Sequence, residues 1–234
     1  MNVRDCVVLV TGANRGLGRA WARLLLEAGA RKVYAGARDP RSIDLHDVIP
    51  LELDITRPEQ VRHAAAECGD VTLLVNNAGI VRGGGLLDDE APERARQELD
   101  TNLFGTLAMC RAFAPILAAN GGGAIVNVLS VLSWISIPGG ATYSISKAAT
   151  WSMTNGVRLA VKGQGTQVVG LHVAFMDTDM TAGVDAPKAQ PHDVVAQAIA
   201  ALEAGQDEVL ADTFTREVKR GLSLERGVYL DGPG

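Results

Sequence analysis

Apolar residues along the chain alternate between short continuous runs and longer segments in which they recur at every third or fourth position. The short runs are rich in β-branched residues and predict seven strands, at 6–10, 32–36, 48–53, 72–75, 124–129, 166–173 and 208–211. The periodic segments predict helices at 17–28, after Pro58, at 99–119, at 141–161 and from Pro191. Strands alternating with helices indicate an α/β fold, a doubly wound parallel sheet of about seven strands with helices on both faces.

No internal repeat, low-complexity block or linker interrupts this pattern. We therefore expect one dinucleotide-binding domain over residues 1–234. Within it, a lid segment is expected at about 178–190, and a C-terminal tail at 212–234 carries mixed charges and no clear periodicity.

Composition narrows the possible partners and the compartment. The net charge is −5 and the basic residues are scattered, which argues against nucleic acid and anionic membrane surfaces as partners. Three widely spaced cysteines, Cys6, Cys68 and Cys110, indicate reduced thiols and a cytoplasmic location. The first apolar run is too short for a signal sequence or a membrane span.

The first predicted strand leads into Thr11-Gly12-Ala13-Asn14-Arg15-Gly16-Leu17-Gly18, and a helix follows. Glycines at positions 12, 16 and 18 permit a tight turn and let backbone amides approach a pyrophosphate at the helix N-terminus. This arrangement predicts a dinucleotide site of the Rossmann type.

A second pattern concerns Tyr143, Lys147 and Ser130. Tyr143 and Lys147 are four residues apart on a predicted helix and therefore project from one face. A neighbouring ammonium lowers the pKa of a phenol, so we expect Lys147 to make Tyr143 a better acid-base group. Ser130 ends a predicted buried strand, where its hydroxyl could donate to an oxygen that gains charge.

Together these motifs resemble the short-chain dehydrogenase/reductase family in its common branch. The shared residues extend nearly to Met180 and include the glycine turn, Asp54, Asn76-Asn77-Ala78-Gly79, Asn102, Ser130 and Tyr143-Ser144-Ile145-Ser146-Lys147. The resemblance implies an oxidoreductase that reduces a ketone or aldehyde reversibly, with Asn102, Ser130, Tyr143 and Lys147 as the catalytic group. Tyr143 would protonate the oxygen, Ser130 would hold it, Lys147 would also bind the nicotinamide ribose, and Asn102 would support a water that links Lys147 to solvent.

The choice of cofactor depends on the residues after the second strand. Ala37 stands where NAD-using relatives usually carry aspartate, and Arg38 follows it. Together with Arg15, Arg38 matches the arrangement that prefers NADP, because arginine can bind a 2′-phosphate. Asp54, Ile55, Asn76, Ala78, Gly79 and Thr178 resemble further cofactor contacts, Asn76 being equally well explained as a structural hydrogen-bonding residue. The expected cofactor-binding set is Gly12, Asn14, Arg15, Gly16, Leu17, Gly18, Arg38, Asp54, Ile55, Asn76, Ala78, Gly79, Tyr143, Lys147 and Thr178.

One departure from the family is Val173-Ala174, which replaces the usual Pro-Gly and changes the loop against the nicotinamide. By analogy, apolar residues at 131–142 and after Thr178 would border a neutral, apolar small-molecule substrate, with no cation placed for a carboxylate.

Leu107, Met109 and Trp151 either belong to the core or serve the dimer or tetramer that the family generally forms. The histidines and cysteines show no ligand-like spacing, so no metal site is expected. Two alternatives remain: a dehydratase or epimerase that uses a bound nucleotide, and a non-catalytic NADP(H) sensor.

Overall fold

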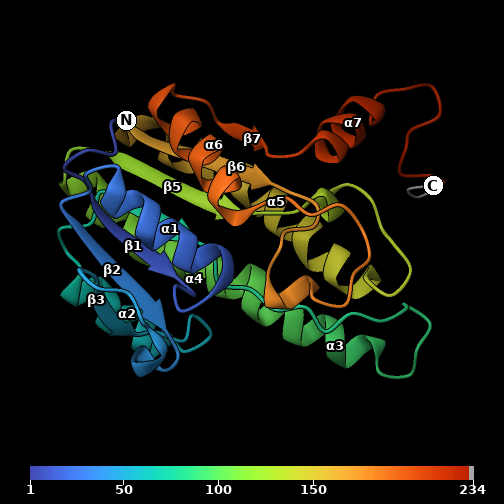
Figure 1. Cartoon of the computed structure of the whole chain (residues 1–234), viewed down its shortest axis with the longest axis horizontal. Coiled ribbons are helices and arrows are strands. Elements are labelled where there is room, and N and C mark those ends of the chain that lie inside the picture. The colour runs from blue at the N-terminus through green and yellow to red at the C-terminus, as the bar shows by residue number, and fades with distance from the viewer. Residues whose placement is uncertain (232–234) are drawn as a thin grey trace.

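The computed structural model describes residues 1–231, and its centre is a seven-stranded parallel sheet (Figure 1). The strand order is β3-β2-β1-β4-β5-β6-β7, which confirms the predicted α/β class. The strands are β1 Val7–Thr11, β2 Lys32–Ala37, β3 Ile49–Glu52, β4 Leu73–Asn76, β5 Gly123–Val128, β6 Thr166–His172 and β7 Glu208–Leu210. All seven lie where the hydrophobic pattern predicts them, with no end displaced by more than one residue.

Helices cover both faces of the sheet. On one face, α1 (Gly16–Glu27) and α6 (Pro191–Glu203) pack into one apolar core. On the other face, α2 (Pro58–Glu67), α4 (Thr106–Ala119) and the end of α5 (Ala141–Val161) share a second core. The order of strands reverses between β1 and β4, so a crevice opens beyond their carboxyl ends, where doubly wound sheets bind ligands.

The helical region before α4 is longer than the pattern predicts. It starts with α3 (Ala91–Glu98), and seven residues of π-helix, Leu99–Gly105, join α3 to α4. The Asn102 carbonyl there accepts a hydrogen bond from Thr150 Oγ1 of α5 at 3.1 Å. A wider turn of this kind is rare and frequently marks a functional site.

The helical stretch from Ala91 to Ala119 is long and apolar enough to cross a membrane by length and composition alone. In the structure, Met109, Cys110, Phe113 and Leu117 of this stretch are buried against the sheet. These are the contacts of a core helix and give no support to a membrane span. Met109 is therefore a core residue rather than a candidate for a subunit interface.

The C-terminal segment contains a helix that the mixed charge pattern concealed. Asp212 caps α7 (Thr213–Gly221) by accepting from the Thr215 backbone N–H at 2.8 Å. This helix stands at one end of the molecule (Figure 1), where Val218 packs against Val131 and Ile135. Residues 232–234 of the predicted tail lie outside the described residues.

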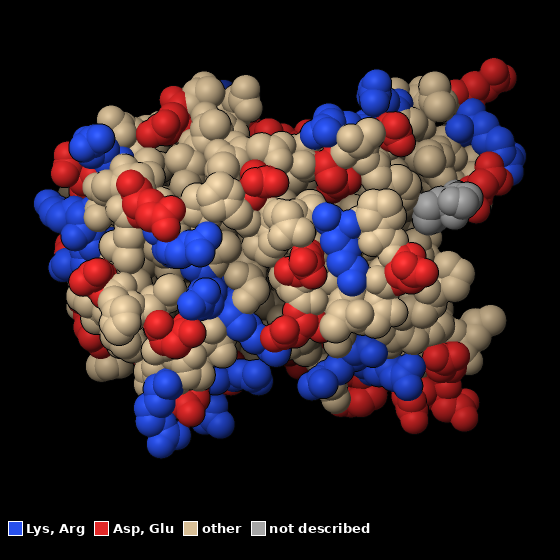
Figure 2. Space-filling model, in the orientation of Figure 1, with Lys and Arg blue, Asp and Glu red and all other residues tan. Residues whose placement is uncertain are grey.

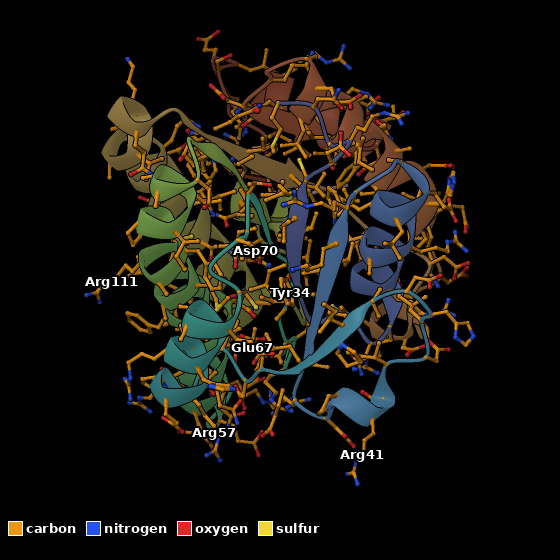
Figure 3. The ribbon with its side chains drawn as sticks, turned by 90° about the vertical axis from the view of Figure 1, so that its left-hand side faces the viewer. Tyr34, Arg41, Arg57, Glu67, Asp70 and Arg111 are labelled. Atoms are coloured by element: carbon orange, nitrogen blue, oxygen red, sulfur yellow. The ribbon has the colours of Figure 1, made fainter. Side chains whose placement is uncertain are left out.

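Charged side chains of both signs are interspersed over the face shown in Figure 2, in keeping with the scattered charges of the sequence. Near the amino ends of the strands, Tyr34 and Asp70 point toward one another (Figure 3), and the tyrosine hydroxyl donates to Asp70 Oδ1 at 3.0 Å. Lys32 Nζ donates to the same carboxylate at 2.6 Å. This cluster links the start of β2 to the segment before β4, at the amino ends of the strands and thus on the side of the sheet opposite the crevice.

Candidate active site

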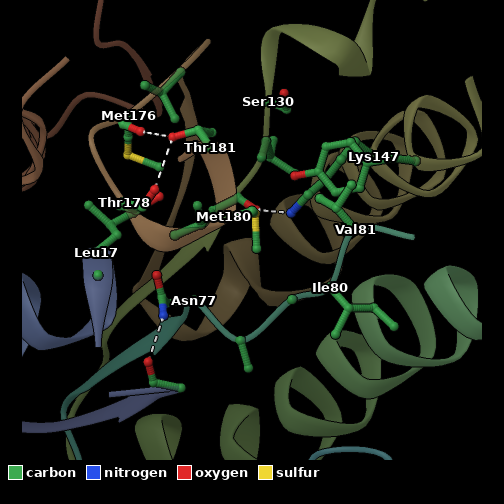
Figure 4. A pocket seen from close by; sticks show the side chains of 18 of the residues that line it. Leu17, Asn77, Ile80, Val81, Ser130, Lys147, Met176, Thr178, Met180 and Thr181 are labelled. Atoms are coloured by element: carbon green, nitrogen blue, oxygen red, sulfur yellow. Dashed lines mark hydrogen bonds between the residues drawn. The ribbon is translucent and has the colours of Figure 1, made fainter. Parts of the chain in front are cut away.

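A cavity of about 2450 Å³ opens at the carboxyl ends of the strands. Its volume is more than twice that of most small-molecule pockets, which leaves room for a dinucleotide and a substrate together. Ser130, Tyr143 and Lys147 line it, as does every predicted cofactor residue apart from Gly18 and Asn76. Figure 4 shows Ser130 and Lys147 on one side of the cavity, with Leu17 and Asn77 on the other.

The glycine turn brings the backbone close to the space a dinucleotide would occupy. Gly12 has φ +66°, and a Cβ there would lie 3.0 Å from Ala78 Cα. Gly18 lies below the cavity, where a Cβ would meet the Gly12 carbonyl oxygen at 2.1 Å. Because α1 begins at Gly16, its free backbone N–H groups and its dipole meet the cavity, and these features fit a pyrophosphate.

Asn77, which the sequence motif contains but the residue predictions omit, holds this turn in place. Its Nδ2 donates to the carbonyls of Thr11 at 3.0 Å and Gly12 at 3.1 Å, and its backbone N–H donates to Thr11 Oγ1 at 3.0 Å. The end of β4 is thereby fastened to the glycine turn after β1. The sequence signal that could have identified Asn77 is its position as a polar residue directly after a buried strand.

Asn76 points away from the cavity. Its Nδ2 donates to Asn127 Oδ1 at 2.9 Å, and Asn127 Nδ2 donates to Thr154 Oγ1 at 3.0 Å. All three side chains are buried, so they link β4, β5 and α5 beneath the site. Asn76 was expected either to contact the cofactor or to form a structural hydrogen bond. The structure supports the structural hydrogen bond.

The two predicted arginines differ in their surroundings. Arg15 pairs with Asp179 at 3.3 Å, and both side chains are largely exposed, so this ion pair contributes little stability. Arg38 lines the cavity and forms no ion pair with any residue from 1 to 231. Burial tends to raise the pKa of nearby Asp54, but hydrogen bonds from Thr56 and the charge of Arg38 leave it lowered. Arg38 therefore presents a positive charge to the cavity, next to Asp54.

Tyr143 and Lys147 lie one turn apart on α5, as predicted. The Lys147 Nζ is 5.6 Å from the centre of the Tyr143 ring and donates to the Val128 carbonyl oxygen at 2.8 Å. Burial lowers the pKa of Lys147 to about 8. The ammonium is thus placed where it can act on the phenol and also on groups in the cavity.

The pKa of Tyr143 changes in the direction opposite to the one expected from the lysine alone. Burial raises it above its ordinary value, and the negative charge of Glu98 adds to the effect. Desolvation of the phenolate outweighs the neighbouring ammonium in the protein without ligand. Tyr143 is consequently protonated at neutral pH, the state that a proton donor requires.

Ser130 follows β5 and caps a short 3₁₀ turn, Val131–Ser133. Its Oγ accepts from the Leu132 backbone N–H at 3.1 Å. Since that contact uses a lone pair, the hydroxyl proton is left for another acceptor. Ser133, a second serine nearby, accepts from the Ser130 backbone N–H at 3.4 Å and is not part of the cavity wall.

Asn102 lies behind the cavity in the π-helical segment. Its amide accepts from the Ile80 N–H at 2.8 Å and donates to the Ile80 carbonyl oxygen and to Ser146 Oγ, each at 2.9 Å. It joins the segment after β4 to the helix that carries Tyr143 and Lys147. In the described residues the Asn102 carbonyl oxygen is engaged by Thr150.

A buried carboxylate that sequence reasoning missed lies under the same segment. Glu98 Oε1 accepts from the backbone N–H groups of Arg82 at 2.6 Å and Gly83 at 3.1 Å. The side chain is fully buried. Position 98 falls outside the motifs, and only the fold brings its charge near Tyr143.

The other end of the cavity is built from segments far apart in sequence. Apolar side chains predominate there, but Lys188 and Arg216 also line the wall. The sequence led us to expect no cation near the substrate, and for the cavity as a whole this expectation is wrong. Arg216 donates to the Leu210 carbonyl oxygen at 2.8 Å. The larger apolar residues of this wall are Val131, Leu132, Ile137, Phe175, Met176, Met180, Val184 and Phe214.

The Val173-Ala174 departure is accommodated by the C-terminal segment. The Ala174 N–H donates to Asp212 Oδ2 at 2.8 Å, and the Val173 carbonyl accepts from the Val131 N–H at 3.1 Å. The same Asp212 side chain caps α7. Thr178 remains beside the glycine turn, since a Cβ on Gly16 would lie 3.4 Å from Thr178 Cγ2.

The three cysteines are free and buried. Within residues 1–231, no group of three or more histidine, cysteine or acidic side chains is arranged to hold a metal ion.

Comparison with protein-family models matches residues 6–189 to short chain dehydrogenase. An uncharacterized oxidoreductase of Myxococcus xanthus is 34% identical over 203 residues, which are 80% of this chain and 79% of the relative. Five further curated relatives are 30–33% identical and longer, and the chain spans between 44% and 65% of their length.

Two solved structures are similar over most of their length. A short chain dehydrogenase from Burkholderia cenocepacia in complex with NADP is 44% identical, with a TM-score of 0.93 and coverage of 97% of this chain and 96% of that chain. A gluconate 5-dehydrogenase from the same organism, in complex with NADP and tartrate, is 26% identical, with a TM-score of 0.81 and coverage of 89% and 94%. Both neighbours hold a nicotinamide dinucleotide.

Proposed function

The chain belongs to the short-chain dehydrogenase/reductase family, and from this premise we propose that it reduces a neutral, largely apolar ketone or aldehyde to an alcohol with NADPH. The observation that carries the proposal is the meeting of Ser130, Tyr143 and Lys147 in the cavity that the glycine turn borders. A proton donor, a hydroxyl and an ammonium beside a dinucleotide cradle are the groups that carbonyl reduction needs.

The residues of the glycine turn would hold the cofactor. Gly12 and Gly18 have no side chain, and neighbouring atoms lie where a Cβ would be. The backbone amides at the start of α1 are therefore not covered by side chains of these two residues, which suits a pyrophosphate. When bound, a reduced nicotinamide supplies hydride to the carbonyl carbon. Lys147 would bind the nicotinamide ribose hydroxyls, and Thr178 would contact the carboxamide.

The protein's own groups manage the proton and the oxygen. Tyr143, kept protonated by burial and by Glu98, donates its proton to the substrate oxygen. Ser130 donates a second hydrogen bond to the same oxygen, because its Oγ is the acceptor in the Leu132 contact and its hydroxyl proton is not used there. Each donor stabilises the negative charge that develops there. Lys147, with a pKa of about 8, supplies positive charge beside the phenol, and Asn102 fastens the helix that carries both residues.

Preference for NADPH rests on Arg38. Its guanidinium lines the cavity without an ion-pair partner among the described side chains, and Ala37 beside it carries no charge to repel a phosphate. Arginine binds phosphate with two parallel hydrogen bonds. The NADP in the two solved neighbours supports the same choice.

Assembly through the long helices is part of the proposal. Phe104, Ile145 and Leu159 are 56%, 41% and 75% exposed on the π-helical segment and α5, so apolar area is available there for a second copy. We infer a homodimer at least. Sedimentation at micromolar concentration would show a monomer if this inference is wrong.

The experiment follows loss of NADPH absorbance with a panel of aryl and alkyl ketones and aldehydes. Ser130→Ala is expected to lower kcat by roughly a hundredfold, since one donor to a developing oxyanion contributes about that much. Ser152→Ala is the matched control, because it removes an exposed serine hydroxyl of α5 that lies outside the cavity, and it is expected to retain most of the activity.

The outcomes separate the alternatives. Turnover with NADPH that depends on Ser130 supports the reductase. NADPH binding without turnover on any member of the panel would favour the sensor. Conversion of a substrate with no net change in NADPH would favour a dehydratase or epimerase.

A further inference from the structure

The carbonyl group of Ser130 is held from behind by a histidine. His172, the last residue of β6, is fully buried, and its Nδ1 lies 3.1 Å from the Ser130 carbonyl oxygen. A carbonyl oxygen can only accept a hydrogen bond, so Nδ1 carries the proton and the neutral ring leaves Nε2 as an acceptor. This contact joins β6 directly to the residue whose hydroxyl faces the cavity.

The imidazole is also held by stacking. Its ring stacks on Trp134 with centroids 4.0 Å apart and planes inclined by 20°. Nε2, an acceptor in this tautomer, has no hydrogen-bond partner among residues 1–231; Glu208 Oε1 of β7, also an acceptor, lies 3.7 Å away and accepts instead from Lys219 of α7 at 2.9 Å. Lys219 Nζ is also 4.7 Å from the centre of a Trp134 ring. Three elements, the serine turn, β7 and α7, therefore meet at one ring.

The charge state of the ring is set by its surroundings. Burial, followed by the positive charges of Lys219, Lys147 and Arg158, lowers the pKa of His172 to about 3, although the bond to Ser130 acts in the opposite direction. The imidazole is therefore neutral near pH 7. Glu208 is the acidic group that faces it.

The direction of the Ser130 hydroxyl depends on its backbone. Ser130 is in an extended conformation, φ −155° and ψ 160°, and its N–H donates to Ser133 Oγ at 3.4 Å. Its Oγ accepts from Leu132 at 3.1 Å. The Ser133 and Leu132 contacts come from the same short turn, whereas the His172 contact and the hydrogen bond from the Val131 N–H to the Val173 carbonyl at 3.1 Å fix that turn to the segment of β6 and the residues that follow it. Without the imidazole only the Val131 bond would hold the Ser130–Val131 peptide, and a rotation of this peptide would redirect the hydroxyl.

We propose that His172 is a positioning residue for Ser130, acting through the Nδ1–H hydrogen bond and the stack on Trp134. The proposal rests on the proposed function, in which Ser130 donates to the substrate oxygen. The imidazole itself does not reach the substrate, because His172 is not part of the cavity wall.

Three substitutions separate orientation from bulk. In His172→Asn, the side-chain Nδ2 occupies nearly the place of Nδ1 and can donate to Ser130. In His172→Gln, the amide reaches the place of Nε2 and loses that donor position. In His172→Leu, the volume stays similar and no donor remains. His63→Leu is the control, since His63 is an exposed histidine on α2.

The measurement compares kcat for ketone reduction with the dissociation constant of NADPH. His172→Leu and His172→Gln are expected to lose roughly ten- to a hundredfold in kcat, as when a residue that orients an active group is removed. His172→Asn should regain most of that loss, and NADPH affinity should stay within about threefold of the wild type in all three. A merely structural histidine would lower kcat in parallel with melting temperature in all three variants, and this result would overturn the proposal.

A measurement on the unmodified protein covers the case in which the variants fail to fold. ¹⁵N NMR of histidine-labelled protein reports which ring nitrogen carries the proton. A neutral His172 protonated at Nδ1 is expected, and protonation at Nε2 would overturn the proposal. Because this test needs no substrate, failure of the positioning role is distinguishable from failure of the reductase assignment, which the ketone panel detects.

Discussion

The two ends of the cavity are built in different ways. At the cofactor end, residues of one turn between Gly12 and Leu17 line the cavity, and close contacts of Gly12 and Gly18 to Ala78 and Asn77 fix the conformation of this turn. At the substrate end, side chains from the segments that follow β5 and β6, from the segment after Thr178 and from α7 form the wall. The first end follows from local geometry, whereas the second depends on long-range packing.

This difference explains why the cofactor end suits one kind of ligand, whereas the side chains of the substrate end can be exchanged to suit different substrates. A backbone cradle recognises a pyrophosphate, which is common to all dinucleotide cofactors. The apolar wall has no such constant partner, and substitutions there change the substrate while leaving the cofactor in place. The proposed catalytic residues Ser130, Tyr143 and Lys147 lie between the two ends, directly after β5 and on α5.

Tyr143→Phe tests whether chemistry can be removed without disturbing the cofactor end, and it has the largest expected effect. Loss of the proton donor should lower kcat by roughly 10²- to 10⁴-fold. NADPH affinity, measured by fluorescence titration, should change little, because the phenyl ring remains. Equal turnover in the variant and the wild type would exclude the phenol from the reaction.

The acid dependence of stability should come in part from His172, which lies behind Ser130 and not at the cofactor end. His172 has a folded-state pKa of about 3 against an ordinary value of 6.5, so between these values the unfolded chain binds a proton that the native protein excludes. Stability is therefore highest above pH 6.5 and falls as pH drops toward 3, by up to a few kcal/mol. Urea denaturation at pH 7.5 and pH 5 should show a smaller loss for His172→Asn. Identical losses in the variant and the wild type would contradict this assignment.

Gly18→Ala should damage the cofactor end alone. A Cβ at this position would lie 2.1 Å from the Gly12 carbonyl oxygen and 2.5 Å from Asn77 Nδ2, so the turn must shift, at a cost of about 1–3 kcal/mol. Weaker NADPH binding and a lower melting temperature are expected. The control is Gly156→Ala on α5, where a Cβ meets nothing within 4 Å, and alanine should stabilise the helix slightly. A neutral Gly18→Ala variant would show that the turn is not constrained as described.

Arg38→Asp should alter the cofactor choice and leave the substrate end unchanged. The carboxylate would repel a 2′-phosphate and accept from a ribose 2′-hydroxyl. We expect the ratio of NADPH to NADH affinity to fall by about tenfold or more, since charge-assisted hydrogen bonds contribute about 1.5–3 kcal/mol. Titration of both cofactors measures the ratio, and an unchanged ratio would remove Arg38 from phosphate recognition.

The sequence predicted most of the fold because its signals are local. Short continuous runs of apolar residues predicted all seven strands, and the spacing of Tyr143 and Lys147 placed both side chains on one helical face. The α7 helix escaped detection because mixed charges hide its narrow apolar side, of which Val218 is the buried member. The π-helical segment arises from contacts of Asn102 with Ile80 and Thr150, which no periodicity encodes.

Electrostatics was the least accessible part of the candidate site. The pair Tyr143 and Lys147 predicted a lowered tyrosine pKa, but burial and Glu98 raise it, and neither factor is visible in the spacing. His172 likewise occupies no motif, and only the pairing of β5 with β6 brings it behind Ser130. Most of the residues that line the cavity were therefore predictable from the sequence, whereas the effect of each on the pKa of its neighbours required the fold.

The most direct test of the central claim is isotope transfer. NADPH carrying deuterium at the reactive face of nicotinamide C4 is incubated with the wild-type protein and the ketone that gives the fastest turnover, and the product is analysed by mass spectrometry. The account predicts an alcohol with one deuterium on the former carbonyl carbon. An alcohol without deuterium, or a product formed with no consumption of NADPH, would contradict it.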